Sequence, residues 1–60
     1  MILTIDKNTY QGDAVTIIIR LHTLYSKSDT FELKGEIITF QRLLHEVAKE
    51  VNIEVKYIQL

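Results

Sequence analysis

Side chains able to bind a metal or move a proton are few and widely spaced in this sequence. It contains two histidines, His22 and His45, and no cysteine, so a thiolate metal site is excluded. His45 is followed by Glu46 and Lys49, so the paired histidines of a helical zinc site are absent. Arg20 lies close to His22 and disfavours a bound cation there. We therefore expect no metal and no cofactor.

Covalent and phosphate chemistry is equally hard to assemble. Ser26 and Ser28 lie in a polar stretch typical of a turn, where hydroxyls bond to nearby backbone, and no signature ties either serine to a histidine. The 2 glycines of the chain are too few for a glycine-rich phosphate loop. Glu32 and Glu36 are near neighbours, but no apolar cover is expected over them to raise the pKa of either carboxyl. The sequence predicts a protein that is not an enzyme.

Length and composition predict a single domain, residues 1–60, that needs a partner. The chain has 60 residues, of which 47% are hydrophobic and 25% charged. A chain of this length buries only about 60% of the surface that its unfolded form exposes. Small scaffolds are usually reinforced by disulfides, a metal or a second subunit. Because the absence of cysteine excludes disulfides, we expect a homodimer.

The balance of charge limits the class of partner. There are 7 lysine and arginine residues against 8 acidic ones, with no run of either sign. A nucleic-acid-binding protein usually shows a basic stripe, so the composition argues against nucleic acid. Arg20 and His22 interrupt the longest apolar run before it reaches the roughly 20 residues that cross a bilayer. The first residues lack the basic start of a signal peptide. We expect a cytoplasmic protein with no membrane partner.

An amphipathic helix is predicted over residues 39–51, "TFQRLLHEVAKEV". Six apolar side chains recur at steps of three and four residues and share one side of this helix: Phe40, Leu43, Leu44, Val47, Ala48 and Val51. The hydroxyl of Thr39 is expected to cap the first turn, and Asn52 is expected to take the left-handed conformation that ends a helix. Arg42 and Glu46 are spaced for an ion pair on the exposed side.

Alternation of apolar and polar residues predicts strands on both sides of this helix. Residues 30–37, "TFELKGEI", place three apolar side chains on one face: Phe31, Leu33 and Ile37. Gly35 falls on the same face, where it is expected to mark a bulge or a close approach of the helix. Residues 52–60 repeat the alternation, and residues 2–5, "ILTI", form a short first strand that is followed by turn residues.

Two periods fit residues 14–25, "AVTIIIRLHTLY". As a strand, the segment has the β-branched content that strands favour, and "SKSD" then supplies a polar turn into the next strand. As a helix capped by Asp13, it separates a polar stripe from an apolar one, the latter made of Ala14, Ile17, Ile18, Leu21 and Tyr25. We take the strand as the prediction and keep the helix as the alternative.

The predicted fold class is α+β: a small antiparallel-rich sheet in the order β-β-β-α-β, with one amphipathic helix packed on one face. The succession of a strand, the "YSKSD" turn, a strand and a helix opened by Thr39 resembles the first half of a ubiquitin-like β-grasp fold over residues 14–51. Many α+β domains share that pattern, so we infer no family from it.

A single helix covers a single face of a sheet, which leaves apolar side chains on the opposite face. Each large aliphatic side chain moved from water to a buried site is worth about 1.5–3 kcal/mol, so we expect a partner to cover that face. The alternative is that Ile58 and Leu60 fold around the end of the helix. The predicted contacts with a second copy or a target are nine residues: Ile18, Arg20, His22, Leu24, Lys34, Ile38, Lys56, Ile58 and Leu60.

The predicted function is that of a small non-enzymatic interaction module, a regulator or inhibitor of a larger protein. The abundance of isoleucine, lysine and threonine suggests a gene from an AT-rich bacterium or phage. A phage-encoded antagonist of a host protein, for example one of antiviral defence, is the specific form we expect, acting in the cytoplasm of the bacterial host. Two alternatives remain open. One is a nucleic-acid-binding dimer that merges Arg20, Lys34 and Lys56 of two subunits, and the other is a structural subunit of a larger assembly.

Overall fold

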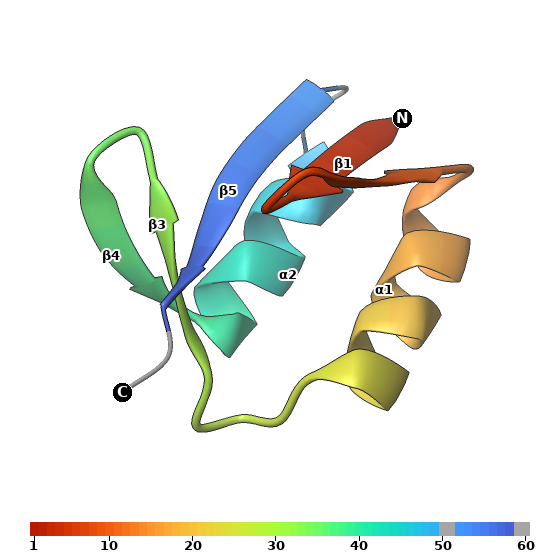
Figure 1. The fold of residues 1–60 in the computed structure, drawn as a ribbon. Coiled ribbons are helices and arrows are strands. Elements are labelled where there is room, and N and C mark those ends of the chain that lie inside the picture. The colour runs from red at the N-terminus through yellow and green to blue at the C-terminus, as the bar shows by residue number, and fades with distance from the viewer. Residues whose placement is uncertain (50–51, 59–60) are drawn as a thin grey trace.

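Among the residues that the structure describes, five strands form one sheet, and two helices pack against it (Figure 1). The structure is a computed structural model and describes residues 1–49 and 52–58. The elements in chain order are β1 Ile2–Ile5, β2 Asn8–Gln11, α1 Ala14–Leu24, β3 Thr30–Leu33, β4 Glu36–Thr39, α2 Phe40–Lys49 and β5 Asn52–Ile58. The α+β class is therefore as predicted, whereas the order β-β-β-α-β is wrong.

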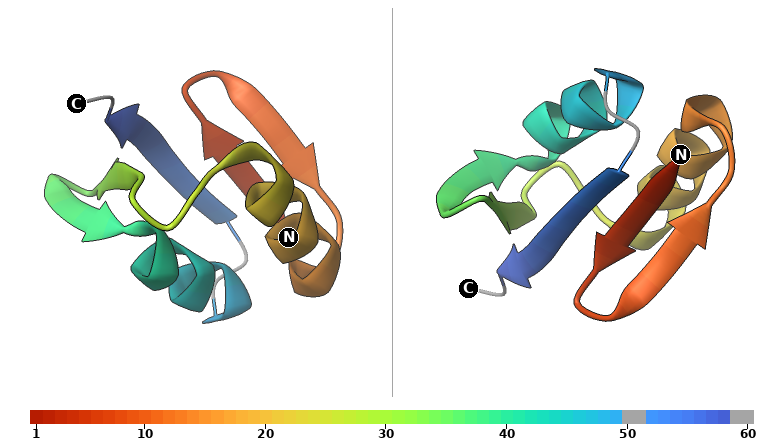
Figure 2. Two further views of the ribbon diagram at one scale, coloured as in Figure 1. Left: turned by 90° about the horizontal axis from the view of Figure 1, so that it is seen from below. Right: turned by 90° about the horizontal axis from the view of Figure 1, so that it is seen from above.

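The last strand lies at the centre of the sheet. The strand order is β2-β1-β5-β3-β4, with β5 parallel to β1 and antiparallel to β3. The sheet is thus mixed rather than antiparallel. Both helices lie on the same side of it, as the two views of Figure 2 show. One face of the sheet is consequently covered by two helices, and the other is open.

The chain uses one local design twice, a hairpin followed by a helix. In β1–β2 and in β3–β4 the strands have equal length and equivalent register. Both hairpins close through two-residue turns with positive φ, at 50° and 85° for Asp6 and Lys7 and again at 50° and 85° for Lys34 and Gly35. Such turns match the twist of a hairpin. Because β1 and β3 run in opposite directions on either side of β5, the two units have an approximate two-fold arrangement about that strand.

The predicted strand at residues 14–25 is wrong, and the helical alternative is confirmed by α1. Asp13 caps the helix, since its Oδ1 accepts the backbone N–H of Thr16 at 2.7 Å. The N–H of Tyr25 donates to the carbonyl of Leu21 at 2.9 Å where the helix ends. Tertiary packing overrides the β propensity here, because a helix directs Ile17 and Leu21 together into the core.

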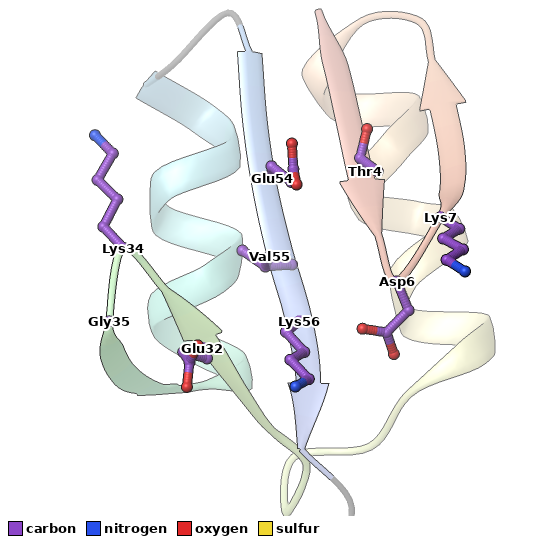
Figure 3. Close-up of a pocket in the computed structure, with 9 residues that line it drawn as sticks. All are labelled: Thr4, Asp6, Lys7, Glu32, Lys34, Gly35, Glu54, Val55 and Lys56. Atoms are coloured by element: carbon purple, nitrogen blue, oxygen red, sulfur yellow. The ribbon is translucent and has the colours of Figure 1, made fainter.

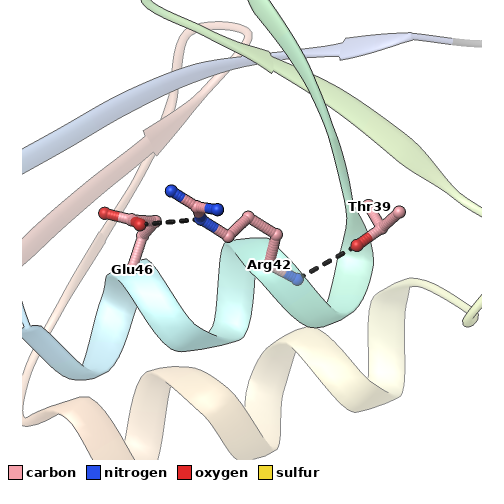
Figure 4. A network of polar contacts seen from close by, with 3 residues as sticks. All are labelled: Thr39, Arg42 and Glu46. Atoms are coloured by element: carbon pink, nitrogen blue, oxygen red, sulfur yellow. Dashed lines mark hydrogen bonds and ion pairs between the residues drawn. The ribbon is translucent and has the colours of Figure 1, made fainter.

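The second predicted helix is confirmed as α2, Phe40–Lys49. The backbone N–H of Arg42 donates to Oγ1 of Thr39 at 3.2 Å, and Nε of Arg42 donates to Oε1 of Glu46 at 2.9 Å (Figure 4). The cap and the ion pair are therefore as expected. Val51 lies outside the described residues. Asn52 does not end the helix in a left-handed conformation but begins β5, in register with Ile2.

Residues 30–37 are two strands and a turn rather than one strand. Gly35 occupies the turn at φ 85°, and no atom approaches the position of a Cβ there, so it marks neither a bulge nor a helix contact. The β-grasp comparison is corrected at the same time. Residues 14–25 are not its first strand, and the hairpin that precedes the first helix lies instead at residues 2–11. The predicted strand at residues 2–5 is confirmed.

Every strand except β2, together with both helices, contributes to one core between sheet and helices. Its buried members are Leu3, Ile5, Ile17, Leu21, Phe31, Ile38, Phe40, Leu43, Val47, Ile53 and Val55. Phe31 lies at the centre of an aromatic group, with ring centroids 5.1 Å from Tyr25, 5.6 Å from Tyr57 and 6.3 Å from Phe40. Because α1 covers the same face of the sheet as α2, the buried apolar side chains of the strands all point to that one face.

Candidate interaction surface

The open face of the sheet is polar at its centre, contrary to the prediction. In register across its centre lie Thr4 beside Glu54 and Glu32 beside Lys56. A shallow depression of about 520 Å³ runs over this face, and Figure 3 shows its lining: Thr4, Asp6, Lys7, Glu32, Lys34, Gly35, Glu54, Val55 and Lys56. Carboxylates and ammonium groups are interspersed there. Charged groups therefore fill the centre of the face, and its exposed apolar side chains, such as Ile37, lie toward the edges, so the apolar layer expected to need a partner is not found there.

The nine predicted contact residues do not share one surface. Four belong to α1, where Ile18 is half-buried and the others are exposed: Arg20, His22 and Leu24. The edge of the His22 ring meets Phe40 at a centroid distance of 5.3 Å. Lys34 lies in the β3–β4 turn, on the far side of the sheet from α1.

The remaining predicted contacts also separate. Ile38 is a core residue, because β4 turns its side chain toward the helices. Lys56 lies on the open face. Ile58 is half-buried at the end of β5, where its carbonyl accepts the hydroxyl of Thr30 at 3.5 Å. Leu60 lies outside the described residues, so the idea that Ile58 and Leu60 fold around a helix end stays a prediction.

Of the five large apolar residues exposed in the described chain, three lie on α1, and the other two are Ile2 on β1 and Ile37 on β4. Val15 is 67% exposed, Ile19 62% and Leu24 51%. Thr23 lies one turn after Ile19, and its hydroxyl donates to the Ile19 carbonyl at 3.2 Å, so it is bonded within the helix. We call Val15, Ile19 and Thr23, which follow one another at steps of four residues, the α1 outer surface, and Leu24 lies beside it. Ile19 and Leu24 also line a depression of about 420 Å³ with Thr16, Arg20 and Thr23.

This surface exists because α1 has more apolar residues than one buried stripe requires. Ile17 and Leu21 are buried against the sheet, yet Val15 and Ile19 occupy the opposite side of the same helix. The side of a helix opposite its buried stripe is normally polar, and Val15 and Ile19 depart from that pattern. Sequence reasoning missed Val15 and Ile19 because it favoured a strand, in which Val15, Ile17 and Ile19 share one face. The helical alternative could have indicated this surface, because three consecutive isoleucines in a helix point in different directions and cannot all face the same core.

A crevice separates the end of α1 from the start of α2. Its volume is about 460 Å³, and its lining combines an apolar base with polar rims: His22, Lys27, Thr39, Phe40, Gln41 and Leu44. The polar groups come from both helical ends, but none of these side chains is a nucleophile activated by a base. The hydroxyls of Ser26 and Ser28 lie 3.0 Å from one another, and no hydrogen bond joins either to a histidine in the described chain.

The basic residues considered for nucleic-acid binding are dispersed. The Arg20 guanidinium carbon lies 5.9 Å from the centroid of the Tyr10 ring on the helical side of the molecule. Lys34 and Lys56 border the open face of the sheet, where acidic side chains alternate with them. Tyr25 is half-buried against Phe31 rather than free to stack on a base. A single chain therefore has no basic strip among its described residues.

Two tyrosines have shifted acidity for structural reasons. The hydroxyl of Tyr57 donates to Oδ1 of Asp29 at 2.9 Å, and this hydrogen bond raises the pKa of Tyr57 above its ordinary value. Burial raises the pKa of Tyr25, with smaller contributions from nearby carboxylates and tyrosines. Asp29 also accepts the N–H of Ser26 at 2.8 Å. The two hydrogen bonds of Asp29 stabilise the loop between α1 and β3. Because both pKa values are raised, both phenols stay protonated at neutral pH.

Comparisons with known proteins return no relative. No protein-family model matches the chain, and neither the curated proteins nor the solved structures contain a match. Within residues 1–49 and 52–58, no helix has the length and apolar character needed to span a membrane. In the same ranges, no three histidine or acidic side chains gather as they would around a metal ion.

Proposed function

We propose that this protein is a non-enzymatic interaction module that regulates or inhibits a larger protein, and that it binds through the α1 outer surface. The observation that carries the proposal is the exposure of Val15 and Ile19, 67% and 62%, on a helix whose other side is packed into the core through Ile17 and Leu21. This replaces the sheet face, which is polar at its centre, as the contact surface. Ile18 and Leu24 are the predicted contact residues that remain next to it.

Burial energetics support this choice of surface. Covering a large aliphatic side chain is worth about 1.5–3 kcal/mol, and Val15, Ile19 and Leu24 lie within one short helix. Exposed apolar groups that gather on one element commonly mark a binding surface, whereas single ones are ordinary. Ile37 is such a single residue, since it is 71% exposed on β4, at the edge of the open sheet face.

The test is capture of a client by the immobilised protein from bacterial lysate, the source class that the composition suggests. The variant is the double substitution Val15→Glu with Ile19→Glu. The matched control is Ile37→Glu, because this isoleucine is as exposed as the other two but lies on the opposite side of the molecule. We expect the control to keep a client that the double variant loses. A client kept by both, or lost by both, would contradict the assignment of the α1 outer surface.

A folding control accompanies the capture. Both variants place a charge at a solvent-exposed position, so neither is expected to change the free energy of unfolding by more than about 0.5 kcal/mol. Circular dichroism melting curves of the three proteins would verify this. Because glutamate has a higher helix propensity than valine or isoleucine, the double variant is expected to keep α1 folded, and a loss of client is then a loss of contact and not of fold.

A further inference from the structure

We propose that the α1 outer surface also binds a second copy of this chain, with the two α1 helices packed antiparallel. The inference rests on the proposed function only in that both use this surface. It goes further by naming the occupant and the orientation. It also assigns the expected homodimer to a helix rather than to a sheet face.

The spacing along α1 allows self-pairing. Val15, Ile19 and Thr23 follow one another at steps of four residues and form a continuous strip on the outside of the helix. Ile19 is at the middle of this strip. If two strips meet antiparallel about Ile19, that residue faces its own copy, and Val15 faces Thr23 of the other chain. The Thr23 hydroxyl is satisfied by the Ile19 carbonyl at 3.2 Å, so its methyl group can face the partner at no cost in hydrogen bonding.

Charge complementarity selects the antiparallel orientation. Asp13 lies at the start of α1, and residues 14–24 contain no acidic side chain. The basic groups lie toward the other end, with His22 in the last turn and Lys27 just beyond the helix. An antiparallel pair brings Asp13 of each chain toward the basic end of the other. It also opposes the two helix dipoles, which stabilises the pair, whereas a parallel pair would bring like ends together.

The central arginines do not prevent this contact. Arg20 lies beside the strip rather than on it, and its guanidinium carbon is 5.9 Å from the Tyr10 ring centroid of the same chain. The side chain is thereby directed toward β2, and away from a helix docked on Val15 and Ile19.

The area available implies a weak dimer. The 11 residues of α1 span about 16 Å. A contact of one such helix with its copy falls in the low range of interface sizes, which is typical of transient association. A second copy and a client would compete for the same residues. The dimer is then a form in which the client-binding residues are covered, and a client of higher affinity dissociates it into monomers.

Single-cysteine variants test the pairing directly, because the chain has no cysteine of its own. A disulfide requires Cα atoms about 4.4–6.8 Å apart. In an antiparallel pair centred on residue 19, Ile19→Cys meets its copy and should form a disulfide-linked dimer under mild oxidation. Two copies of Val15→Cys lie about 12 Å apart along the axis, so this variant alone should not. A mixture of Val15→Cys and Thr23→Cys should form the mixed dimer.

The control is Ile37→Cys, whose exposure matches that of residue 19 but whose side chain lies on the open face of the sheet. We expect several-fold more dimer from Ile19→Cys than from this control. Equal yields would overturn the proposal. Dimers from Val15→Cys alone, in amounts matching Ile19→Cys, would overturn the antiparallel orientation.

The proposal and the proposed function can fail separately. If Ile19→Cys yields no more dimer than the control while Val15→Glu with Ile19→Glu still abolishes client capture, self-pairing is rejected and the client-binding role stands. If the disulfide dimers form as expected and no client depends on this surface, self-pairing stands and the client-binding role is rejected. Sedimentation of the unmodified protein should show a mass that rises from one chain toward two with concentration.

Discussion

At the scale of single residues, two turns of identical shape hold different residue types. Lys7 and Gly35 both occupy the second turn position at φ 85°. Glycine adopts positive φ without steric cost, whereas an L side chain there costs roughly 1–2 kcal/mol. At this second position the hairpin β1–β2 therefore contains strain that the equivalent hairpin β3–β4 avoids, whereas both have a non-glycine residue at φ 50° in the first position.

Exchanging these residues should shift stability in opposite directions. We expect Gly35→Ala to lower the free energy of unfolding by about 1 kcal/mol, although open space surrounds the position of its Cβ. We expect Lys7→Gly to raise it by up to about 1 kcal/mol, since relief of strain exceeds the added entropy of the unfolded chain. Urea denaturation of the two variants measures both changes. A loss of stability in Lys7→Gly would contradict the strain argument.

The Tyr57 phenol predicts how stability responds to high pH. Its hydrogen bond to Asp29 raises the pKa of Tyr57 above the ordinary value of 10.0 in the folded protein. A raised folded pKa gives stability that is fully present below pH 10.0 and is lost as the pH rises through the folded pKa. We expect the free energy of unfolding to fall above about pH 10. Tyr57→Phe should weaken that fall without removing it, because the pKa of Tyr25 is also raised.

At the scale of elements, α1 is the segment whose structure differs from the sequence-based prediction, since it is a helix and not a strand. The β-branched run favoured a strand, and a strand puts Ile17 and Ile19 on one face. The Asp13 cap and the burial of Ile17 with Leu21 determine the helix instead. Local propensity is a weak preference that packing can reverse, and the packing in question involves strands distant in the sequence. By contrast, α2 was predictable because its cap, its spacing and its charge pair all favour the same structure.

Alanine substitutions distinguish a helix from a strand at residues 14–25. Ile17 is 2% exposed, so Ile17→Ala should lower the free energy of unfolding by about 2–4 kcal/mol. Ile19 lies on the solvent side of the same helix, and Ile19→Ala should change it by less than about 0.5 kcal/mol in the monomer. Denaturation at low protein concentration makes the comparison. Equal losses from the two variants are what a strand buried on one face would give, and would contradict the helix.

At the scale of the whole molecule, the error in α1 changed the conclusion about function. With a single helix, the sheet needed an outside partner on its second face. In the structure both helices cover one side, and the turn at Lys34 and Gly35 places Ile38 opposite Phe31 on that covered side. The centre of the open face is left to charged groups such as Glu32 and Lys56. The sequence supported an α+β protein with exposed apolar groups, and that much agrees with the structure. It could not place those groups, because their location depends on which period residues 14–25 adopt.

The repeated hairpin-helix unit was also invisible in the sequence. The two copies share strand length, register and turn angles, yet their turns read "DK" and "KG", and their helices differ in charge. Backbone geometry repeats where residue types do not, since several residues can fill a turn or face a core. The parallel contact of β1 with β5 was equally beyond the sequence, because alternation predicts a strand but not its neighbour.

The central place of β5 makes the two units depend on one another. β5 is bonded to β1 on one side and to β3 on the other, so neither hairpin joins the rest of the sheet without it. Ile53 is 4% exposed and lies opposite Leu3 in this register. We expect Ile53→Ala to lower the free energy of unfolding by about 2–4 kcal/mol and to reduce hydrogen-exchange protection in β1 and in β3 by the same factor. Ile37→Ala, on the exposed side of the edge strand β4, should change neither the free energy of unfolding nor the protection. Protection lost in β1 alone would mean that the hairpin-helix units open independently and that β5 does not couple them.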